Sequence, residues 1–430
     1  MPDSAGKRVL EPFEICSIRP PTENSSLSFK LTRGCYWNRC AFCPVYKTKT
    51  KFAKRSLDEV LADIARAKRL DDFMLENGLS RSDIRDEDDR LETIMQAIER
   101  CGADVQETSL FERSSDPEDS DDPLAWFQPW FKNTPHLPDS IQHLLSWRMA
   151  GGRTCFLGDA DGLIVKPDFL LAVIHAVQSK FPTIERFTVY GRTYCAARLR
   201  SSADLRAYRA AGLDRVHFGV ESGSDAVLSL MNKGETNDDH VEGLAKARDA
   251  GLSCSIYVMP GLGGVGKQEE HVAQTAEVIN QTRPDFVRLR TLQIFPGTPL
   301  EEKVRVGDFR QADESSVVRE IRDLVAAINV STHITSDSAT NLVAIQGDAV
   351  SDRAVMLGRL DAYLFLDARE KTLYSFRARL ASFIGQYGGL SPEIYAAIRP
   401  WIRHGRLEIS GVKDVELRRA IELIRSRLMP

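Results

Sequence analysis

Strand-like and helix-like segments alternate along most of this chain, and that alternation constrains its fold more than any other feature. Short apolar runs such as LSFKL (27–31) and TCFLGD (154–159) each precede a longer segment with apolar residues at helical spacing, for example PDFLLAVIHAVQSKF (167–181). About six such units follow one another before residue 300. Repeated strand-then-helix units are typical of a parallel sheet covered by helices. We therefore predict an α/β fold with a parallel sheet, open or barrel-like.

Two regions depart from this pattern. Residues 78–150 hold acidic and Pro/Ser-rich stretches between the first predicted helix and the second predicted strand, so we interpret them as an insertion. The aromatic segment LAWFQPWF (124–131) is interpreted either as part of a lid over an active site or as a docked surface excursion. Beyond residue 300 the pattern predicts helices. The expected domains are an N-terminal extension (1–26), a core that carries the insertion (27–300) and a helical C-terminal region (301–430).

Composition narrows the class of protein. The 430 residues carry a net charge of −4 and a pI near 6.1, so there is no basic field, and we expect no nucleic acid as the main partner. The N-terminus lacks the apolar stretch of a signal peptide, and no later run reaches the length of a membrane helix. We therefore expect a cytoplasmic protein with no membrane partner.

Three cysteines lie within nine positions of the stretch KLTRGCYWNRCAFCPVYK (30–47), namely Cys35, Cys40 and Cys43. A structural zinc site normally closes with four ligands, and no Cys or His occurs between residues 44 and 100. An iron–sulfur cluster held by three thiolates leaves one iron without a protein ligand, and an open metal position can bind a reactive partner. A non-catalytic iron–sulfur or zinc protein remains the alternative.

The stretch LTRGCYWNRCAFCPVY resembles the cluster loop of the radical S-adenosylmethionine (radical SAM) superfamily. This resemblance implies that Cys35, Cys40 and Cys43 ligate a [4Fe–4S] cluster whose fourth iron binds S-adenosylmethionine. It also implies that Phe42 lies near the adenine. The spacing departs from the commonest one in the superfamily, because it is C-x4-C-x2-C where C-x3-C-x2-C is usual.

Motifs at two predicted strand ends extend the resemblance. In FLGDAD, Gly158 and Asp159 stand where the superfamily has a Gly-Glu motif, which implies contact with the amino group of the cofactor. In YGRTY, Arg192 is suited to the cofactor carboxylate and Tyr190 to the adenine or the substrate. A plain turn and a surface arginine are the alternatives at these two places.

The segment GLDRVHFGVESGSDAVLSLMNKG (212–234) resembles the oxygen-independent coproporphyrinogen dehydrogenase-like and Elp3-like branch. The resemblance implies that Glu221 binds ribose hydroxyls and that Lys233 pairs with the cofactor carboxylate. Both residues depart from that branch, which has Gln and Arg at these positions. In SIYVMPGLGG, the resemblance implies that Met259 and Gly261 pack against the adenine.

The resemblance implies a partial (β/α)6 TIM-type barrel with an insertion after the first helix and a helical C-terminal region. It implies a radical SAM enzyme that receives electrons from a donor such as flavodoxin or ferredoxin; no catalytic residue is assigned. We expect a small organic substrate, with a peptide or RNA as the alternative. Arg288 and Arg290, on one face of a predicted strand, either meet an anionic substrate or form structural ion pairs.

Overall fold

The structure is a computed structural model that describes residues 9–47, 51–78, 93, 96–97, 104–105 and 135–428. Most of the predicted insertion, including the aromatic segment 124–131, lies outside these residues. The chain folds into two compact units. The first unit comprises Met1–Asn38, Val45–His217 and Lys246–Ser253, and the second comprises Arg39–Pro44, Phe218–Ala245 and Cys254–Pro430. The predicted domain boundaries at residues 26 and 300 stay a prediction.

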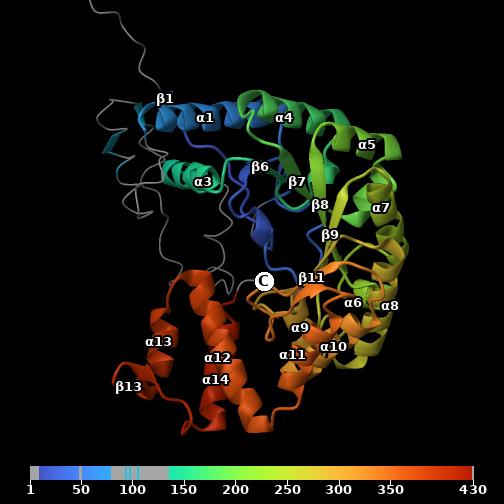
Figure 1. The fold of residues 1–430 in the computed structure, drawn as a ribbon, viewed down its shortest axis with the longest axis vertical. Coiled ribbons are helices and arrows are strands. Elements are labelled where there is room, and N and C mark those ends of the chain that lie inside the picture. Colours follow the sequence, from blue (N-terminus) through green and yellow to red (C-terminus); the bar gives the residue numbers. More distant parts are fainter. Residues whose placement is uncertain are drawn as a thin grey trace, which may run out of the picture. The chain divides into compact units, whose positions relative to one another are not determined.

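The first unit is built on parallel strands with helices beside them. Its strands, in spatial order, are β2 (Leu27–Lys30), β6 (Thr154–Gly158) and β7 (Arg186–Gly191). The register pairs Leu27 with Cys155 and Thr154 with Arg186. The main helices are α1 (Leu57–Glu76), α3 (Leu137–Met149), α4 (Pro167–Lys180) and α5 (Ser202–Ala210). Figure 1 shows α1 lying beside α4.

Local sequence explains why α1 begins where it does and which face it buries. Ser56 accepts a hydrogen bond from the Glu59 backbone, and the Glu59 side chain accepts one from the Ser56 backbone, which together form a capping box. Apolar residues at helical spacing, among them Val60, Ile64 and Ala67, are buried. The apolar face predicted from the sequence is therefore the buried face of α1.

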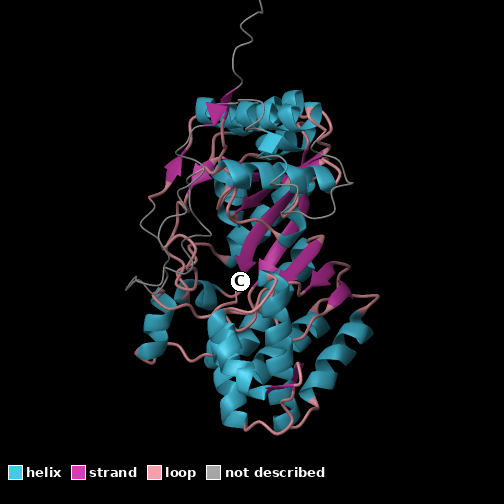
Figure 2. Ribbon diagram, turned by 90° about the vertical axis from the view of Figure 1, so that its left-hand side faces the viewer, coloured by secondary structure: helices cyan, strands magenta, loops and turns pink. Residues whose placement is uncertain are grey.

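The second unit continues the parallel arrangement. Its strands are β9 (Ser253–Val258), β10 (Phe286–Leu289) and β11 (His333–Thr335), all parallel, and the antiparallel β12 (Gln346–Asp348). β8 (Leu213–Glu221) is divided between the units after His217. The helices α6 (Asp225–Leu230), α7 (Asn237–Asp249) and α8 (Gln268–Thr282) follow β8 and β9. In Figure 2 helices (cyan) lie beside the strands (magenta). The predicted α/β class with parallel strands is confirmed.

The region beyond residue 300 differs from expectation in one respect. It is mainly helical, as predicted, but β11 pairs in parallel with β10, and β12 pairs with β11. These strands have only three residues each, too few for a periodic pattern to be recognised in the sequence. The helices of this region are α9 (Pro299–Arg305), α10 (Glu314–Ala327), α11 (Arg353–Leu364), α12 (Ala368–Tyr387), α13 (Pro392–Ile398) and α14 (Asp414–Arg425).

The longest described helices, α1 and α12, have 20 residues each and carry charged side chains along their length. A helix that spans a bilayer needs about 20 predominantly apolar residues. No described helix combines sufficient length with sufficient apolar character to cross a membrane.

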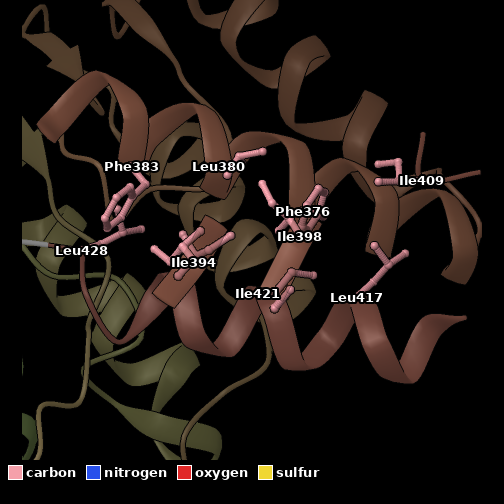
Figure 3. Packing of buried hydrophobic residues seen from close by; sticks show 11 residues of the cluster. Phe376, Leu380, Phe383, Ile394, Ile398, Ile409, Leu417, Ile421 and Leu428 are labelled. Atoms are coloured by element: carbon pink, nitrogen blue, oxygen red, sulfur yellow. The ribbon is translucent and has the colours of Figure 1, made fainter. Parts of the chain in front are cut away.

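The last three helices share a hydrophobic cluster. Figure 3 shows side chains of α12, α13 and α14 pointing toward one another. The buried members are Phe376, Leu380, Phe383, Ile394, Ile398, Ile409, Leu417, Ala420, Ile421, Ile424 and Leu428. The Phe376 side chain is fully buried and meets the Trp401 ring at a centroid distance of 5.5 Å. This cluster therefore holds the C-terminal helices together.

Replacing Phe376 by Ala is expected to lower the free energy of unfolding by about 3–5 kcal/mol, because it opens a cavity among these helices. Urea titration followed by circular dichroism measures the change. Phe365, which is 87% exposed, provides the matched control. Its replacement by Ala is expected to stay within about 0.5 kcal/mol, and equal losses in the two variants would contradict the proposed core.

Candidate functional site

The cysteine loop connects two short strands of the first unit. β3 (Thr32–Arg33) and β4 (Ala53–Lys54) pair antiparallel, with Thr32 opposite Lys54. Gly34 follows β3 with φ of +78°, a left-handed conformation that glycine adopts without a steric penalty. The chain thus turns sharply just before the first cysteine.

The three predicted ligand cysteines form no disulfide bond and are partly buried. The Asn38 backbone N–H donates a hydrogen bond to Cys35 Sγ at 3.4 Å. Among the described residues, no three His, Cys, Asp or Glu side chains are grouped as a metal site. Cys35 belongs to the first unit, whereas Cys40 and Cys43 belong to the second. Their role as ligands therefore stays a prediction.

Asp159 ties the two ends of the cysteine loop together. Its carboxylate accepts hydrogen bonds from the Gly34 N–H (2.9 Å) and from the Tyr46 hydroxyl (2.7 Å), and it is only 1% exposed. Burial raises the pKa of Asp159. The preceding carbonyl, that of Gly158, accepts from the Leu31 N–H at 2.8 Å. Both residues thus support the loop, and their predicted contact with the cofactor stays a prediction.

Arg192 also contacts the cysteine loop. Its guanidinium carbon lies 5.3 Å from the centre of the Tyr36 ring and 5.1 Å from that of Trp37, in cation–π geometry. The Arg192 side chain is buried, so the surface-arginine alternative is wrong. Tyr190, the other residue predicted here, packs its ring edge-on against Phe156 at 5.2 Å. The structure therefore gives Arg192 a loop-supporting contact that sequence reasoning did not identify.

A buried thiol lies beneath the same loop. Cys195 Sγ donates a hydrogen bond to Asp161 Oδ2 at 3.0 Å and lies 3.5 Å from the Tyr36 hydroxyl. Cys195 begins a π-helical turn (Cys195–Leu199) directly after the YGRTY motif. The sequence gives no signal of this contact, because nothing in the spacing relates Cys195 to Tyr36.

In the second unit, the backbone of Ala41 anchors the segment that carries Cys40 and Cys43. The Ala41 N–H donates to the Met231 carbonyl (2.8 Å), and its carbonyl accepts from the Leu300 N–H (3.0 Å). Met231 ends α6 and Leu300 lies at the start of α9. The segment is therefore held by two helices that sequence reasoning did not connect with it.

The residues predicted to lie near adenine gather in the second unit. Phe42 packs against a cluster formed by Ala41, Val227, Met231, Met259, Leu262, Leu292, Leu300 and Phe309. Gly261 adjoins this cluster with φ of +88°, and a Cβ there would lie 3.5 Å from Leu292 Cβ. A glycine is favoured by that conformation. Phe42 thus lies near Met259 and Gly261, although more than 200 residues separate it from them in the sequence.

Glu221 and Lys233 also meet in the second unit. Lys233 Nζ lies 3.7 Å from Glu221 Oε1 and 3.2 Å from Glu235 Oε2. Burial raises the pKa of Glu221, and the Lys233 ammonium partly opposes that rise. Glu221 has φ of +65°, which is strained for a residue with a side chain. The Glu221 carbonyl accepts from the Met259 N–H at 2.9 Å, which joins this pair to the adenine-side turn.

The two arginines of β10 and its extension have structural partners. Arg288 pairs with Asp337 at 2.9 Å and donates to Ser255 Oγ at 3.2 Å. Arg290 lies over the Tyr257 ring at 4.3 Å. For Arg288, the structure favours the ion-pair alternative over contact with a substrate.

Comparison with known proteins relates this chain to one family. The family model described as the Radical SAM superfamily matches residues 138–276. This match spans about a third of the chain. The relationship predicted from the motifs is confirmed for this segment. The match begins after the cysteine loop, so it does not test the three ligands.

Individual relatives match parts of the chain. A tRNA-2-methylthio-N(6)-dimethylallyladenosine synthase of Chloroherpeton thalassium is 26% identical over 34% of this chain and 32% of its own length. Elongator complex protein 3 of Danio rerio is 33% identical over 31% and 23%. The structure of Elp3 from the archaeon Methanocaldococcus infernus has a TM-score of 0.37 at 18% identity, covering 56% of this chain and 60% of that one. The chain thus spans less than a third of the length of the two curated relatives, the synthase and Elongator complex protein 3.

The names of these relatives bear on one expectation. Several are named for tRNA, as in the synthase above and in a tRNA uridine(34) acetyltransferase of Methanocaldococcus infernus. We expected no nucleic acid as a partner because of the net charge. That expectation is unsupported, and it conflicts with the names of these relatives. Net charge averages over the whole chain, so it does not report a local basic surface.

Replacing Tyr46 by Phe is expected to lower the free energy of unfolding of the metal-free protein by about 1–3 kcal/mol, because the buried Asp159 carboxylate loses a donor. Urea titration measures the loss. The same change at Tyr395, which is 48% exposed, is the control and is expected to stay within about 0.5 kcal/mol. If the two variants lose equal stability, Asp159 does not fasten the loop through Tyr46.

Proposed function

We propose that this chain is a radical SAM enzyme in which Cys35, Cys40 and Cys43 ligate a [4Fe–4S] cluster. The observation that carries the proposal is a short loop with three thiols whose ends are joined through the buried Asp159. Three thiolates fit the donor set of such a cluster, because iron–sulfur clusters are bound by cysteine sulfur. The Asn38 N–H adds a hydrogen bond to one of these sulfurs.

The second unit offers groups suited to S-adenosylmethionine. Phe42 and Met259 supply apolar surface for an adenine, and Gly261 lets the backbone approach it closely. Glu221 can accept hydrogen bonds from ribose hydroxyls, and Lys233 can pair with the cofactor carboxylate. The strained backbone of Glu221 supports this assignment, because such conformations cluster at functional sites.

When bound, the reduced cluster and S-adenosylmethionine supply a 5′-deoxyadenosyl radical that abstracts hydrogen from a substrate. The protein's own contribution is to bind and orient the cluster and S-adenosylmethionine and to shield them from water. Most of the assigned side chains are buried or partly buried, which limits the access of water. We propose a small organic substrate, and an electron donor of the flavodoxin or ferredoxin type.

Replacing Cys35, Cys40 or Cys43 by Ala is expected to abolish cluster assembly and the formation of 5′-deoxyadenosine. Iron and sulfide are measured after anaerobic reconstitution, and the nucleoside is measured after incubation with S-adenosylmethionine and dithionite. Cys254→Ala is the matched control, because this thiol is buried within β9 and is expected to leave iron content unchanged. Full iron content in any of the three variants would refute that cysteine as a ligand.

RNA is the second candidate substrate, and one surface favours it. β13 (Ile402–Arg403) and β14 (Arg406–Leu407) form a hairpin whose turn residues His404 and Gly405 have φ of +50° and +72°. Arg403 and Arg406 are exposed at this turn. Exposed arginines at a hairpin tip suit phosphate groups, which dominate affinity for nucleic acids. The tRNA-named relatives add to this support.

Reversing both charges in an Arg403→Glu/Arg406→Glu variant is expected to weaken binding of a transfer RNA pool and to reduce the salt slope of log K by about 2. Fluorescence anisotropy at about 50 to 200 mM salt measures both quantities. Arg305→Glu/Arg310→Glu, at exposed sites elsewhere in the second unit, is the control. Absence of salt-dependent binding by the unaltered protein would remove RNA as a candidate.

A further inference from the structure

A buried chain of three side chains joins the turn after β8 to the turn after β9 in the second unit. His271 Nδ1 lies 2.7 Å from Ser222 Oγ, and His271 Nε2 lies 3.4 Å from Glu320 Oε1. Ser222, His271 and Glu320 are 0%, 2% and 4% exposed. Ser222 follows β8, His271 lies on α8 and Glu320 on α10. We call this set the Ser–His–Glu chain.

These residue types resemble a hydrolytic triad, but the surroundings exclude nucleophilic catalysis. A nucleophile has to reach a substrate carbon, whereas Ser222 is completely buried. Ser222 Oγ also accepts a hydrogen bond from the Ser224 N–H at 3.0 Å. The Ser–His–Glu chain therefore bonds neighbouring backbone groups of the protein and does not attack a substrate.

At one end, Glu320 holds the turn after β9. Its Oε1 accepts from the Gly261 N–H at 2.6 Å, and its Oε2 accepts from Gln268 Nε2 at 3.3 Å. Gly261 has no side chain to anchor it, so its backbone conformation depends on bonds of this kind. Glu320 thereby fixes a residue assigned to the adenine side of the cofactor site.

At the other end, His271 and Ser222 hold the turn after β8. Ser222 directly follows the strained Glu221, and its N–H donates to the Val220 carbonyl at 2.8 Å. His271 also forms a hydrogen bond with the Met259 backbone. The Ser–His–Glu chain thus contacts both turns that carry the assigned cofactor residues.

Burial also sets the charges within the set. Burial raises the pKa of Glu320 to about 7, and hydrogen bonds from the Gly261 N–H and Gln268 oppose that rise. Burial lowers the pKa of His271 to about 4, so His271 is neutral at neutral pH. His271 Nδ1 is hydrogen-bonded to the Ser222 hydroxyl, whereas Nε2 contacts the Glu320 carboxyl group at 3.4 Å. The set therefore combines hydrogen bonds with a close contact inside the second unit.

We propose that Glu320 is a positioning residue for S-adenosylmethionine, holding the Gly261 turn through a hydrogen bond and packing against His271, which is hydrogen-bonded to Ser222 beside Glu221. This inference rests on the proposed function, in which these two turns bind adenine and ribose. Glu320 lies beyond residue 300, outside the part of the chain that carries the superfamily motifs. The C-terminal region thus contributes to the cofactor site through α10.

Glu320→Ala is expected to raise the Kd for S-adenosylmethionine about 10- to 100-fold, because the Gly261 turn loses its buried acceptor. Glu320→Gln keeps an oxygen for the Gly261 N–H and is expected to recover most of the affinity. Equilibrium dialysis of the anaerobically reconstituted full-length protein measures Kd. Product formation at saturating cofactor is expected to fall much less than affinity, because Glu320 touches neither substrate nor cofactor.

Glu314→Gln is the matched control, since Glu314 lies on the same helix but bonds Arg379 and Ser375. Its Kd is expected to equal that of the unaltered protein. If Glu320→Ala does not fold, as judged by its thermal transition, Glu320→Gln and His271→Gln replace it, with His271→Gln expected to weaken binding. Glu221→Gln shows how much the Kd for S-adenosylmethionine changes when a residue assigned to direct contact with the cofactor is altered.

The outcomes separate the two proposals. If the unaltered, cluster-loaded protein binds no S-adenosylmethionine, the proposed function fails, and the positioning role fails with it. If the unaltered protein binds the cofactor and Glu221→Gln weakens binding, while Glu320→Ala, or His271→Gln where Glu320→Ala does not fold, binds as tightly as Glu314→Gln, only the positioning role is overturned. Weakened binding by Glu320→Ala with recovery in Glu320→Gln supports it.

Discussion

The cysteine loop depends on one buried carboxylate. Asp159 accepts hydrogen bonds from Gly34, just before the first cysteine, and from Tyr46, just after the last. A loop with this much irregular backbone gains little from regular secondary structure, so side-chain bonds have to define its ends. In the second unit, the two backbone bonds of Ala41 hold the middle of the same loop. Each unit thus fixes its own part of the segment that carries the thiols.

The second unit stores strain at the end of β8 and surrounds it with restraints. A non-glycine residue with positive φ costs about 1–3 kcal/mol, and it persists only where neighbouring contacts hold it. Glu221 has such contacts in the Lys233 ammonium and in the Met259 N–H, which bonds its carbonyl. The Ser–His–Glu chain supplies a second restraint from α8 and α10. Side chains of these two helices therefore contact both turns that carry the assigned residues.

Several residues that the sequence assigned to one cofactor site lie near one another in the structure, and their contact with the cofactor stays a prediction. Met259 and Gly261 were assigned to one site with Phe42, and the structure brings them to one apolar cluster. Glu221 and Lys233 were assigned together and lie 3.7 Å apart. Such residues become neighbours because parallel strands bring their carboxyl ends to one edge of the sheet. The same reasoning missed helix residues such as Glu320, whose helical positions carry no signal of what they face.

The amino-acid sequence by itself determined the class of fold and the resemblance of the central segment to the radical SAM superfamily, and it supplied the candidate cofactor residues. Those properties are local, because periodicity, turn residues and short motifs are read from neighbours in the chain. Tertiary structure alone decided which of these residues have partners: Arg288 pairs with Asp337, Arg192 lies over the loop aromatics, and Asp159 fastens the loop. These contacts join residues about 50 to 160 positions apart, and only the folded packing of strands and helices brings such groups into contact.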